Sequence, residues 1–246
     1  MRHRPIAFAC AALLAAACGG GGGGGSDFIA AADALAAKMG KPGEKADMPA
    51  ADDPAVKAFN AEAERGLTAL GTDAMPVDGF TTFEKLCGKA ATIVGTYVSA
   101  GGAGGAAPQQ MAANAERYME QMFTPLLFAA HCSAAHMPFL EEQAGDLDPA
   151  KKGALEQMRN GATAQAVGLI QLSGDESVAG PRRQQILDLL ARDAANFALG
   201  MTPDQRAQVV QMAAQLRERL PDDQKAKADT IRTAFEETKC GRICSG

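Results

Sequence analysis

Tryptophan is absent from this chain of 246 residues, which also has only two tyrosines and three histidines. Sugar-binding and base-binding sites usually need several aromatic rings for stacking, so this scarcity disfavours both kinds of ligand. The patterns G-x-S-x-G, S-x-x-K, H-E-x-x-H and G-x-x-x-x-G-K-[ST] are missing as well. These absences favour a protein that is not an enzyme, and they predict no cofactor and no metal site.

The first seventeen residues have the three parts of a secretory signal peptide. Arg2, His3 and Arg4 form a basic start, an apolar core follows, and Ala15–Ala17 are small. The apolar run over residues 5–17 is much shorter than the roughly 20 residues that a membrane-spanning helix needs. We therefore expect residues 1–17 to be cut off.

The junction LAAAC, from Leu14 to Cys18, resembles the lipobox of bacterial lipoproteins. The resemblance implies that the chain is cut before Cys18 and that Cys18 carries the lipid. A lipobox usually has a larger aliphatic residue three places before the cysteine, where this chain has Ala15. One alternative is that Cys10 is the lipidated residue, although the apolar core before it is too short for a signal peptide. The other is that Cys18 is an incidental thiol.

Seven glycines, Gly19–Gly25, follow the cysteine. Glycine buries no side chain and loses the most entropy on ordering, so residues 18–26 are predicted to be a lipidated tether with a reach on the order of 15 Å. In lipoproteins an aspartate after the lipidated cysteine retains the protein in the inner membrane. Because Gly19 stands there, the resemblance implies the periplasmic side of the outer membrane; the alternative is a secreted or soluble periplasmic protein.

The exported chain is acidic. Removing residues 1–17 takes Arg2 and Arg4 from the 24 basic residues and none of the 29 acidic ones, which leaves a formal charge of −7. A nucleic-acid partner is therefore not expected. The expected partners are membrane lipid, through the anchor, and another envelope protein.

Helix start and stop signals recur along residues 27–246, whereas strand patterns are almost absent. Asp53 before Pro54 predicts an N-cap and a first-turn proline, and Thr202 with Gln205 predicts a capping box. Thr81 with Glu84 predicts another capping box after a loop over residues 71–80. Helices are expected over residues 27–39, 54–70, 81–100, 109–140, 181–200, 203–220 and 221–240, and one more helix is expected to open at Asp148 and Pro149 and to include Leu169.

The segment from residue 109 to residue 140 is the most apolar of the exported chain and is predicted to be the central core helix or helix pair. Pro125 should kink it and Pro138 should disturb it again, because proline lacks an N–H donor. Since short connections favour antiparallel neighbours, we predict an all-α fold over residues 27–246. Its architecture is an irregular antiparallel bundle of about seven helices after a flexible tether.

Four cysteines remain after cleavage and lipidation: Cys87, Cys132, Cys240 and Cys244. An even number in an exported domain indicates two disulfides. We prefer Cys87 with Cys132 and the local pair Cys240 with Cys244; the two crossed pairings stay open. A straight hairpin would separate Cys87 from Cys132 by roughly 16 Å along the helices, so this pair needs a chain reversal, for which Pro125 is a possible place.

Two metal or redox interpretations remain as alternatives. Cys240 and Cys244 form a C-x-x-x-C pattern, which matches neither the redox pattern C-x-x-C nor a paired zinc motif. His131 and His136, with Met111, Met119, Met122 and Met137, have the ligand types of a soft-metal site for Cu(I). The two histidines are about 140° apart around a helix, so core packing is the simpler interpretation. The acidic run that begins at Glu141 is interpreted as a solvated turn.

Together these patterns predict a membrane-anchored envelope lipoprotein with a non-enzymatic structural or partner-binding role. The alternative is a module that binds a small ligand or a soft metal in the helical core over residues 118–139.

Overall fold

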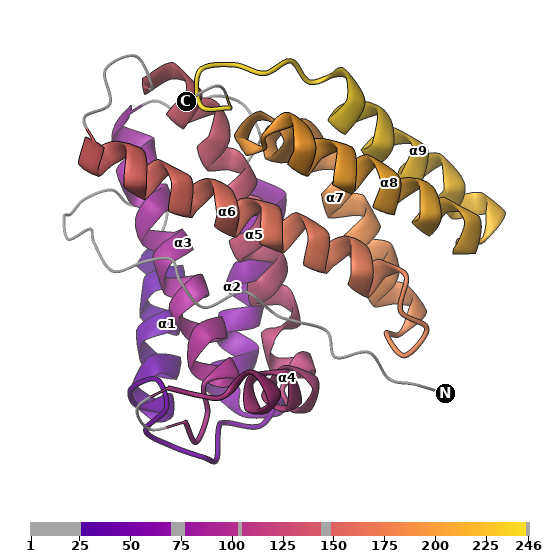
Figure 1. Ribbon diagram of the computed structural model, residues 1–246. Coiled ribbons are helices and arrows are strands. Elements are labelled where there is room, and N and C mark those ends of the chain that lie inside the picture. Colours follow the sequence, from indigo (N-terminus) through magenta and orange to yellow (C-terminus); the bar gives the residue numbers. More distant parts are fainter. Residues whose placement is uncertain (1–25, 70–76, 103–104, 144–148, 245–246) are drawn as a thin grey trace. The chain divides into compact units, whose positions relative to one another are not determined.

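The computed structural model describes residues 26–69, 77–102, 105–143 and 149–244, and within them every regular element is an α-helix (Figure 1). The all-α prediction is confirmed, with nine helices in these ranges where about seven were expected. Their bounds are α1 Ser26–Met39, α2 Pro54–Ala69, α3 Val77–Val98, α4 Pro108–Arg117, α5 Met119–Gln143, α6 Pro149–Ser173, α7 Gly180–Gly200, α8 Pro203–Arg219 and α9 Asp222–Glu237. None of these helices is long and apolar enough to cross a membrane.

The chain forms two compact units. The first consists of Met1–Gly71 and Met75–Cys132, and the second of Thr72–Ala74 and Ser133–Gly246. The boundary falls inside α5, after Cys132, so α5 contributes residues to both units.

Local capping signals place several helix ends where the sequence predicts them. The Asp53 carboxylate accepts a hydrogen bond from the Ala55 N–H at 2.8 Å and caps α2. At the start of α8, the Gln205 N–H donates to Thr202 Oγ1 and the Thr202 N–H donates to Gln205 Oε1, which completes the capping box. Gly40 ends α1 with φ +77°, a left-handed conformation that favours glycine.

The core of the first unit is built around three phenylalanines from three helices. Phe28 of α1 lies 5.2 Å from Phe59 of α2 and 5.0 Å from Phe128 of α5, measured between ring centroids. All three rings are buried. At these separations aromatic pairs contribute about 0.5–1.5 kcal/mol beyond the burial of their surface. The cluster therefore ties α1, α2 and α5 together.

The apolar segment after residue 108 breaks at Tyr118 and not at Pro125. Tyr118 has φ −107° and ψ 17°, and α5 then runs without interruption through Pro125 and Pro138. The Tyr118 side chain is buried, and its hydroxyl donates a hydrogen bond to the carbonyl of Ala46 at 3.0 Å. The chain reversal considered near Pro125 is therefore wrong: the helix ends at Tyr118, where the side chain makes a tertiary contact.

The connector between α1 and α2 is fastened by hydrogen bonds to its backbone carbonyls. Besides the bond from Tyr118 to Ala46, the Tyr97 hydroxyl donates to the Pro49 carbonyl at 3.1 Å, and the Gly101 N–H donates to the Lys45 carbonyl at 2.8 Å. The two tyrosine rings lie 5.3 Å apart between centroids. A polar connector without regular structure is thereby held against the end of α3 and the junction between α4 and α5.

The break at Tyr118 also brings Cys87 to Cys132. Cys87 lies 11 residues before the end of α3, and Cys132 lies 13 residues after the start of α5. A difference of two residues is about 3 Å along a helix, in place of the roughly 16 Å that one straight helix from residue 109 would produce. The two Cα atoms are 5.7 Å apart and the cysteines form a disulfide, the preferred pairing.

In the second unit, α6 packs against α7 and α8, and α9 packs against the same two helices. Each helix buries one face, as the 3.6-residue period predicts. The largest buried side chains of the three C-terminal helices include Ile186, Phe197, Leu216, Ile231 and Phe235.

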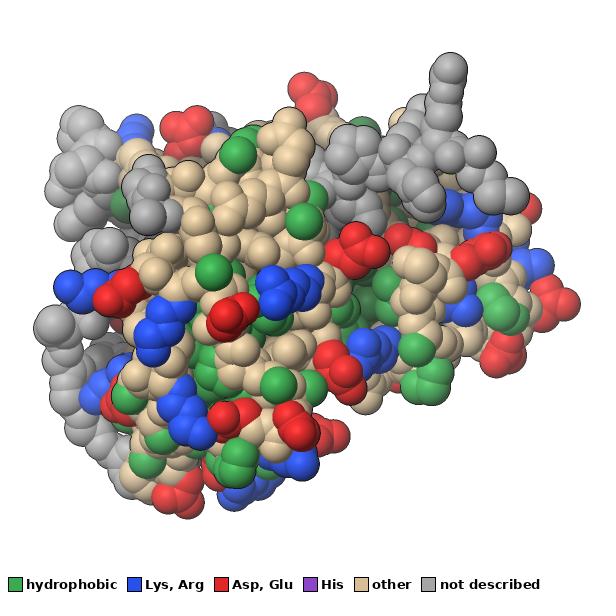
Figure 2. Space-filling model, turned by 90° about the horizontal axis from the view of Figure 1, so that it is seen from below, with side chains coloured by type: hydrophobic (Ala, Val, Ile, Leu, Met, Phe, Trp, Pro, Cys, Tyr) green, Lys and Arg blue, Asp and Glu red, His purple; other side chains and the backbone are tan. Residues whose placement is uncertain are grey.

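The surface drawn in Figure 2 has acidic and basic side chains interspersed, with apolar side chains scattered among them.

Two further helix ends differ from the predictions. The third helix begins at Val77, so Thr81 lies inside it and is not its N-cap. The last helix ends at Glu237, before Cys240, because residues 238–244 turn away to meet other helices of the unit. Local residue patterns misplaced both ends.

The close approach of α2 to α5 predicts the effect of a single methyl group. A Cβ at Gly66 would lie 2.5 Å from Cε2 of Phe128, a ring that is fully buried. Gly66→Ala should therefore lower the free energy of unfolding by about 1–3 kcal/mol, measured by urea denaturation. Gly95→Ala in α3 is the control, since a Cβ there meets nothing within 4 Å. It should stabilise the protein by about 0.5–1 kcal/mol, and equal losses in both variants would contradict the packing argument.

The burial of Tyr97 predicts a loss of stability at alkaline pH. Burial, with a smaller effect of the Asp53 carboxylate, raises the pKa of the Tyr97 hydroxyl above its ordinary value. The native state then keeps a proton that the unfolded chain releases above about pH 10, so stability falls as the pH rises past that point. Tyr97→Phe should be less stable at pH 7 by about 1 kcal/mol, yet lose less stability between about pH 9 and about pH 11. Parallel curves of unfolding free energy against pH would refute this assignment.

Candidate functional site

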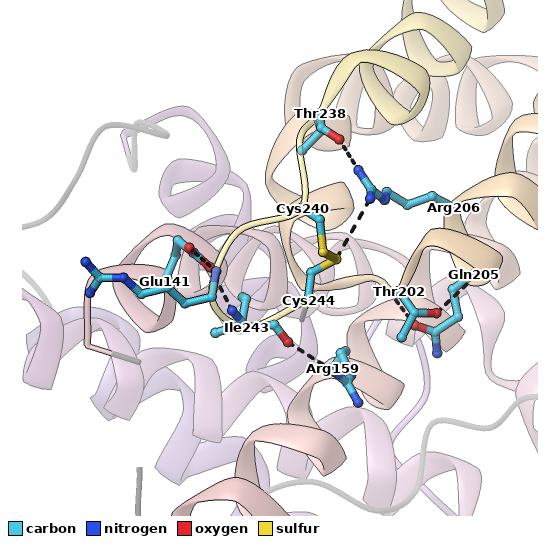
Figure 3. The surroundings of a disulfide bond; sticks show 10 residues. Glu141, Arg159, Thr202, Gln205, Arg206, Thr238, Cys240, Ile243 and Cys244 are labelled. Carbon is cyan, nitrogen blue, oxygen red and sulfur yellow. Dashed lines mark hydrogen bonds between the residues drawn. A yellow bond between two sulfur atoms is a disulfide. The ribbon is translucent and has the colours of Figure 1, made fainter. Parts of the chain in front are cut away.

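A group of charged side chains and a disulfide surrounds the loop Thr238–Cys244, all within the second unit (Figure 3). A disulfide joins Cys240 to Cys244, with their Cα atoms 5.3 Å apart. Cys240 is exposed, whereas Cys244 is buried with 6% of its surface accessible. The loop thus presents one half of its disulfide to solvent and keeps the other half covered.

The carboxylate of Glu141, near the end of α5, holds the backbone of this loop. Its Oε1 accepts a hydrogen bond from the Arg242 N–H, and its Oε2 accepts one from the Ile243 N–H at 3.0 Å. A Cβ at Gly241 would lie 2.0 Å from Glu141 Oε1, so only glycine allows this approach. The sequence interpretation of Glu141 as part of a solvated turn was wrong, because Glu141 lies in α5 and binds the backbone of the C-terminal loop.

Two arginines hold the loop from the other helices. Arg159 of α6 donates a hydrogen bond from Nη1 to the Ile243 carbonyl at 3.0 Å. Arg206 of α8 donates from Nη1 to the Thr238 carbonyl, and its Nη2 lies 3.8 Å from Cys244 Sγ. The second contact places a permanent positive charge beside one sulfur of the disulfide.

The capping box at the start of α8 positions Arg206. Arg206 follows Gln205 directly, and its N–H donates to the Thr202 carbonyl at 3.0 Å, so it belongs to the capped first turn. A capped first turn frays less than an uncapped one. The capping box that predicts the start of α8 therefore also fixes the backbone of Arg206, whose side chain contacts Cys244 Sγ.

The other predicted disulfide lies in the first unit and is enclosed. Cys87 and Cys132 have 3% and 2% of their surface accessible. This pair links α3 to α5 and has the burial of a structural disulfide. Cys18, the predicted lipid-attachment residue, lies outside the described residues.

Of the residues considered as a soft-metal site, both histidines, Met122 and Met137 are buried, whereas Met111 and Met119 are half-buried. His131 and His136 are buried in α5, with 0% and 7% of their surface accessible. Met137 packs closely against α7, since a Cβ at Gly200 would lie 2.4 Å from its sulfur. Across the described ranges, no group of three or more His, Cys, Asp or Glu side chains is arranged to hold a metal ion.

Sequence reasoning identified the cysteines of this site but missed Glu141, Arg159 and Arg206. Their partners are distant in sequence: Glu141 is 102 residues from Ile243, and Arg159 is 84 residues from it. The one available signal was Gly241 between the two cysteines, which marks a backbone that another group approaches closely.

Comparison with protein-family models, curated protein sequences and solved structures gives no significant match for this chain.

The carboxylate at the loop predicts a local effect on amide exchange. In Glu141→Ala the Arg242 and Ile243 N–H groups lose their acceptor, a loss of about 1–3 kcal/mol per group. Hydrogen exchange of these amides should therefore accelerate at least about tenfold, measured by peptide-resolved mass spectrometry. Glu142→Ala, which changes the exposed neighbouring carboxylate, is the control and should leave their exchange unchanged. Equal acceleration in both variants would show that Glu141 does not hold the loop.

Proposed function

We propose that this chain is an envelope lipoprotein, anchored by a lipid on Cys18, whose helical part has a structural or partner-binding role. The basic start, the apolar core and the LAAAC junction of residues 1–18 support the anchor. Each buried methylene of an acyl chain contributes about 0.8 kcal/mol, so two or more chains hold a protein on a membrane stably.

The observation that carries the proposal is the pairing of all four cysteines that remain after Cys18. Two lie at disulfide distance in each unit, Cys87 with Cys132 and Cys240 with Cys244. Disulfides form and persist in oxidising compartments, whereas cytosolic thiols are kept reduced. A lipidated Cys18 then leaves the exported chain without an unpaired thiol.

The glycine run supports a tethered arrangement. The first helix, α1, begins at Ser26, directly after Gly19–Gly25. A Gly-rich chain of this length spans on the order of 15 Å, enough to keep the helical part near a membrane without fixing its orientation. A partner in the same envelope then meets the protein at a short distance from the lipid surface.

A second candidate function is the binding of a small ligand or a soft metal in the segment over residues 118–139. It draws on His131 and Met122, which supply an imidazole and a thioether close together in sequence. Copper that co-purifies with the protein and is lost on changing His131 and Met122 would favour this function over the structural one.

The anchor is tested with two serine variants in the native host. Cys18→Ser should abolish the acyl mass on the N-terminal peptide and release the protein from the membrane fraction. Cys10→Ser is the matched control, because it changes the competing cysteine of the same signal peptide, and it should leave both unchanged. Intact-mass spectrometry of the membrane fraction gives the readout.

The assignment would be refuted if acylation survived in Cys18→Ser or were lost in Cys10→Ser.

A further variant tests the placement in the outer membrane. Gly19→Asp introduces the residue that retains lipoproteins in the inner membrane, and it should shift the protein to that fraction in a density gradient.

A further inference from the structure

The two disulfides differ in how an external thiol can reach them. Exchange requires that a thiolate attack a disulfide sulfur directly, so its rate depends on access to that sulfur. Cys87 and Cys132 are both buried, and so is Cys244, with 6% of its surface accessible. Cys240 is exposed. Of the four paired cysteines, Cys240 is the one that an incoming thiolate can approach without unfolding the chain.

The surroundings of Cys244 suit it to be the sulfur that leaves. Attack on Cys240 releases Cys244 as a thiolate, and the exchange is faster when this leaving thiolate is stabilised. The Nη2 of Arg206 lies 3.8 Å from Cys244 Sγ. A guanidinium stays charged at all ordinary pH values and stabilises a nearby thiolate. The pair is therefore asymmetric, with an exposed cysteine to be attacked and a buried cysteine to leave.

The loop is held by contacts that do not pass through the disulfide. Glu141 accepts hydrogen bonds from the Arg242 and Ile243 N–H groups, and Arg159 donates one to the Ile243 carbonyl. The Ile243 side chain is buried, with 1% of its surface accessible. These contacts keep Cys244 in place when the sulfur–sulfur bond opens, so its thiolate stays close enough to attack again.

We propose that the Cys240–Cys244 disulfide is a site of reversible exchange with thiols from outside the chain. In the first step an external thiolate attacks Cys240 Sγ, a mixed disulfide forms there, and Cys244 leaves as a thiolate. In the second step another external thiolate attacks the external sulfur of the mixed disulfide and releases Cys240 as a thiolate. In sum, two external thiols are oxidised to a disulfide, and the cysteine pair is reduced to two thiols.

The reverse of the first step restores the Cys240–Cys244 disulfide. When no second thiol arrives, the Cys244 thiolate attacks Cys240 of the mixed disulfide, expels the external thiolate and restores the original pair. This inference goes beyond the proposed function and does not depend on the lipid anchor. The chemistry is that of a thiolate, whether it belongs to a small molecule or to another exported protein.

The first test uses the full exported chain with reduced glutathione as the probe. After acid quenching and alkylation, peptide mapping should locate glutathione on Cys240, while the Cys87–Cys132 disulfide stays intact and circular dichroism shows the native helix content. Glutathione found mainly on Cys244 would overturn the proposal. So would the opening of both disulfides only under conditions that unfold the protein.

The second test separates the charge of Arg206 from its hold on the loop. Arg206→Gln should slow exchange at pH 7 about five- to tenfold, and Arg206→Lys, which keeps a positive charge, should recover most of the rate. Arg159→Gln is the matched control, because Arg159 also donates to a loop carbonyl, at Ile243. An equal slowing in Arg159→Gln and Arg206→Gln would show that no leaving thiolate is stabilised, and it would refute the assigned roles.

A third measurement distinguishes the source of the thiol. A reduced, unfolded protein rich in cysteine replaces glutathione at the same thiol concentration. A faster reaction with the protein identifies protein thiols as the preferred reactant, and a faster reaction with glutathione identifies small thiols. Either outcome supports exchange at Cys240. If neither probe reacts with the folded chain, the proposal is overturned.

Discussion

The point at which α5 begins determines which of its side chains meet the other helices of the first unit. Tyr118 leaves helical geometry while its hydroxyl is bonded to the Ala46 carbonyl, and α5 starts at the next residue. From there the helical period fixes the later residues of α5 within the first unit: Phe128 enters the aromatic cluster and Cys132 meets Cys87. A start several residues earlier or later would turn each of these side chains toward a different neighbour.

The C-terminal loop illustrates how charged side chains organise backbone that forms no helix. Its N–H groups are bound by a carboxylate and its carbonyls by two guanidinium groups, and hydrogen bonds to charged groups are stronger than those between neutral ones. The loop therefore keeps its conformation with or without the small constraint that a five-residue disulfide ring adds. The Cys240–Cys244 pair is thus set into a hydrogen-bonded backbone, which the proposed reversible exchange requires.

The two disulfides serve different ends within one oxidised chain. The buried pair of the first unit links α3 to α5 covalently inside the core. The pair of the second unit closes a short loop, one of whose cysteines is exposed. A tethered envelope protein that carries such a pair would meet other exported thiols close to the membrane, where the proposed anchor keeps it.

The sequence by itself determined the all-α class, most helix ends and most buried faces. These features depend on local signals, such as Asp53 before Pro54, Thr202 with Gln205, or apolar residues at the helical period. Only the tertiary structure decided the break at Tyr118, and with it the helix register that joins Cys87 to Cys132. It likewise decided the contacts of Glu141 and Arg206 with the C-terminal loop. The physical reason is that these features depend on hydrogen bonds between residues 32 to 102 positions apart, which no local pattern encodes.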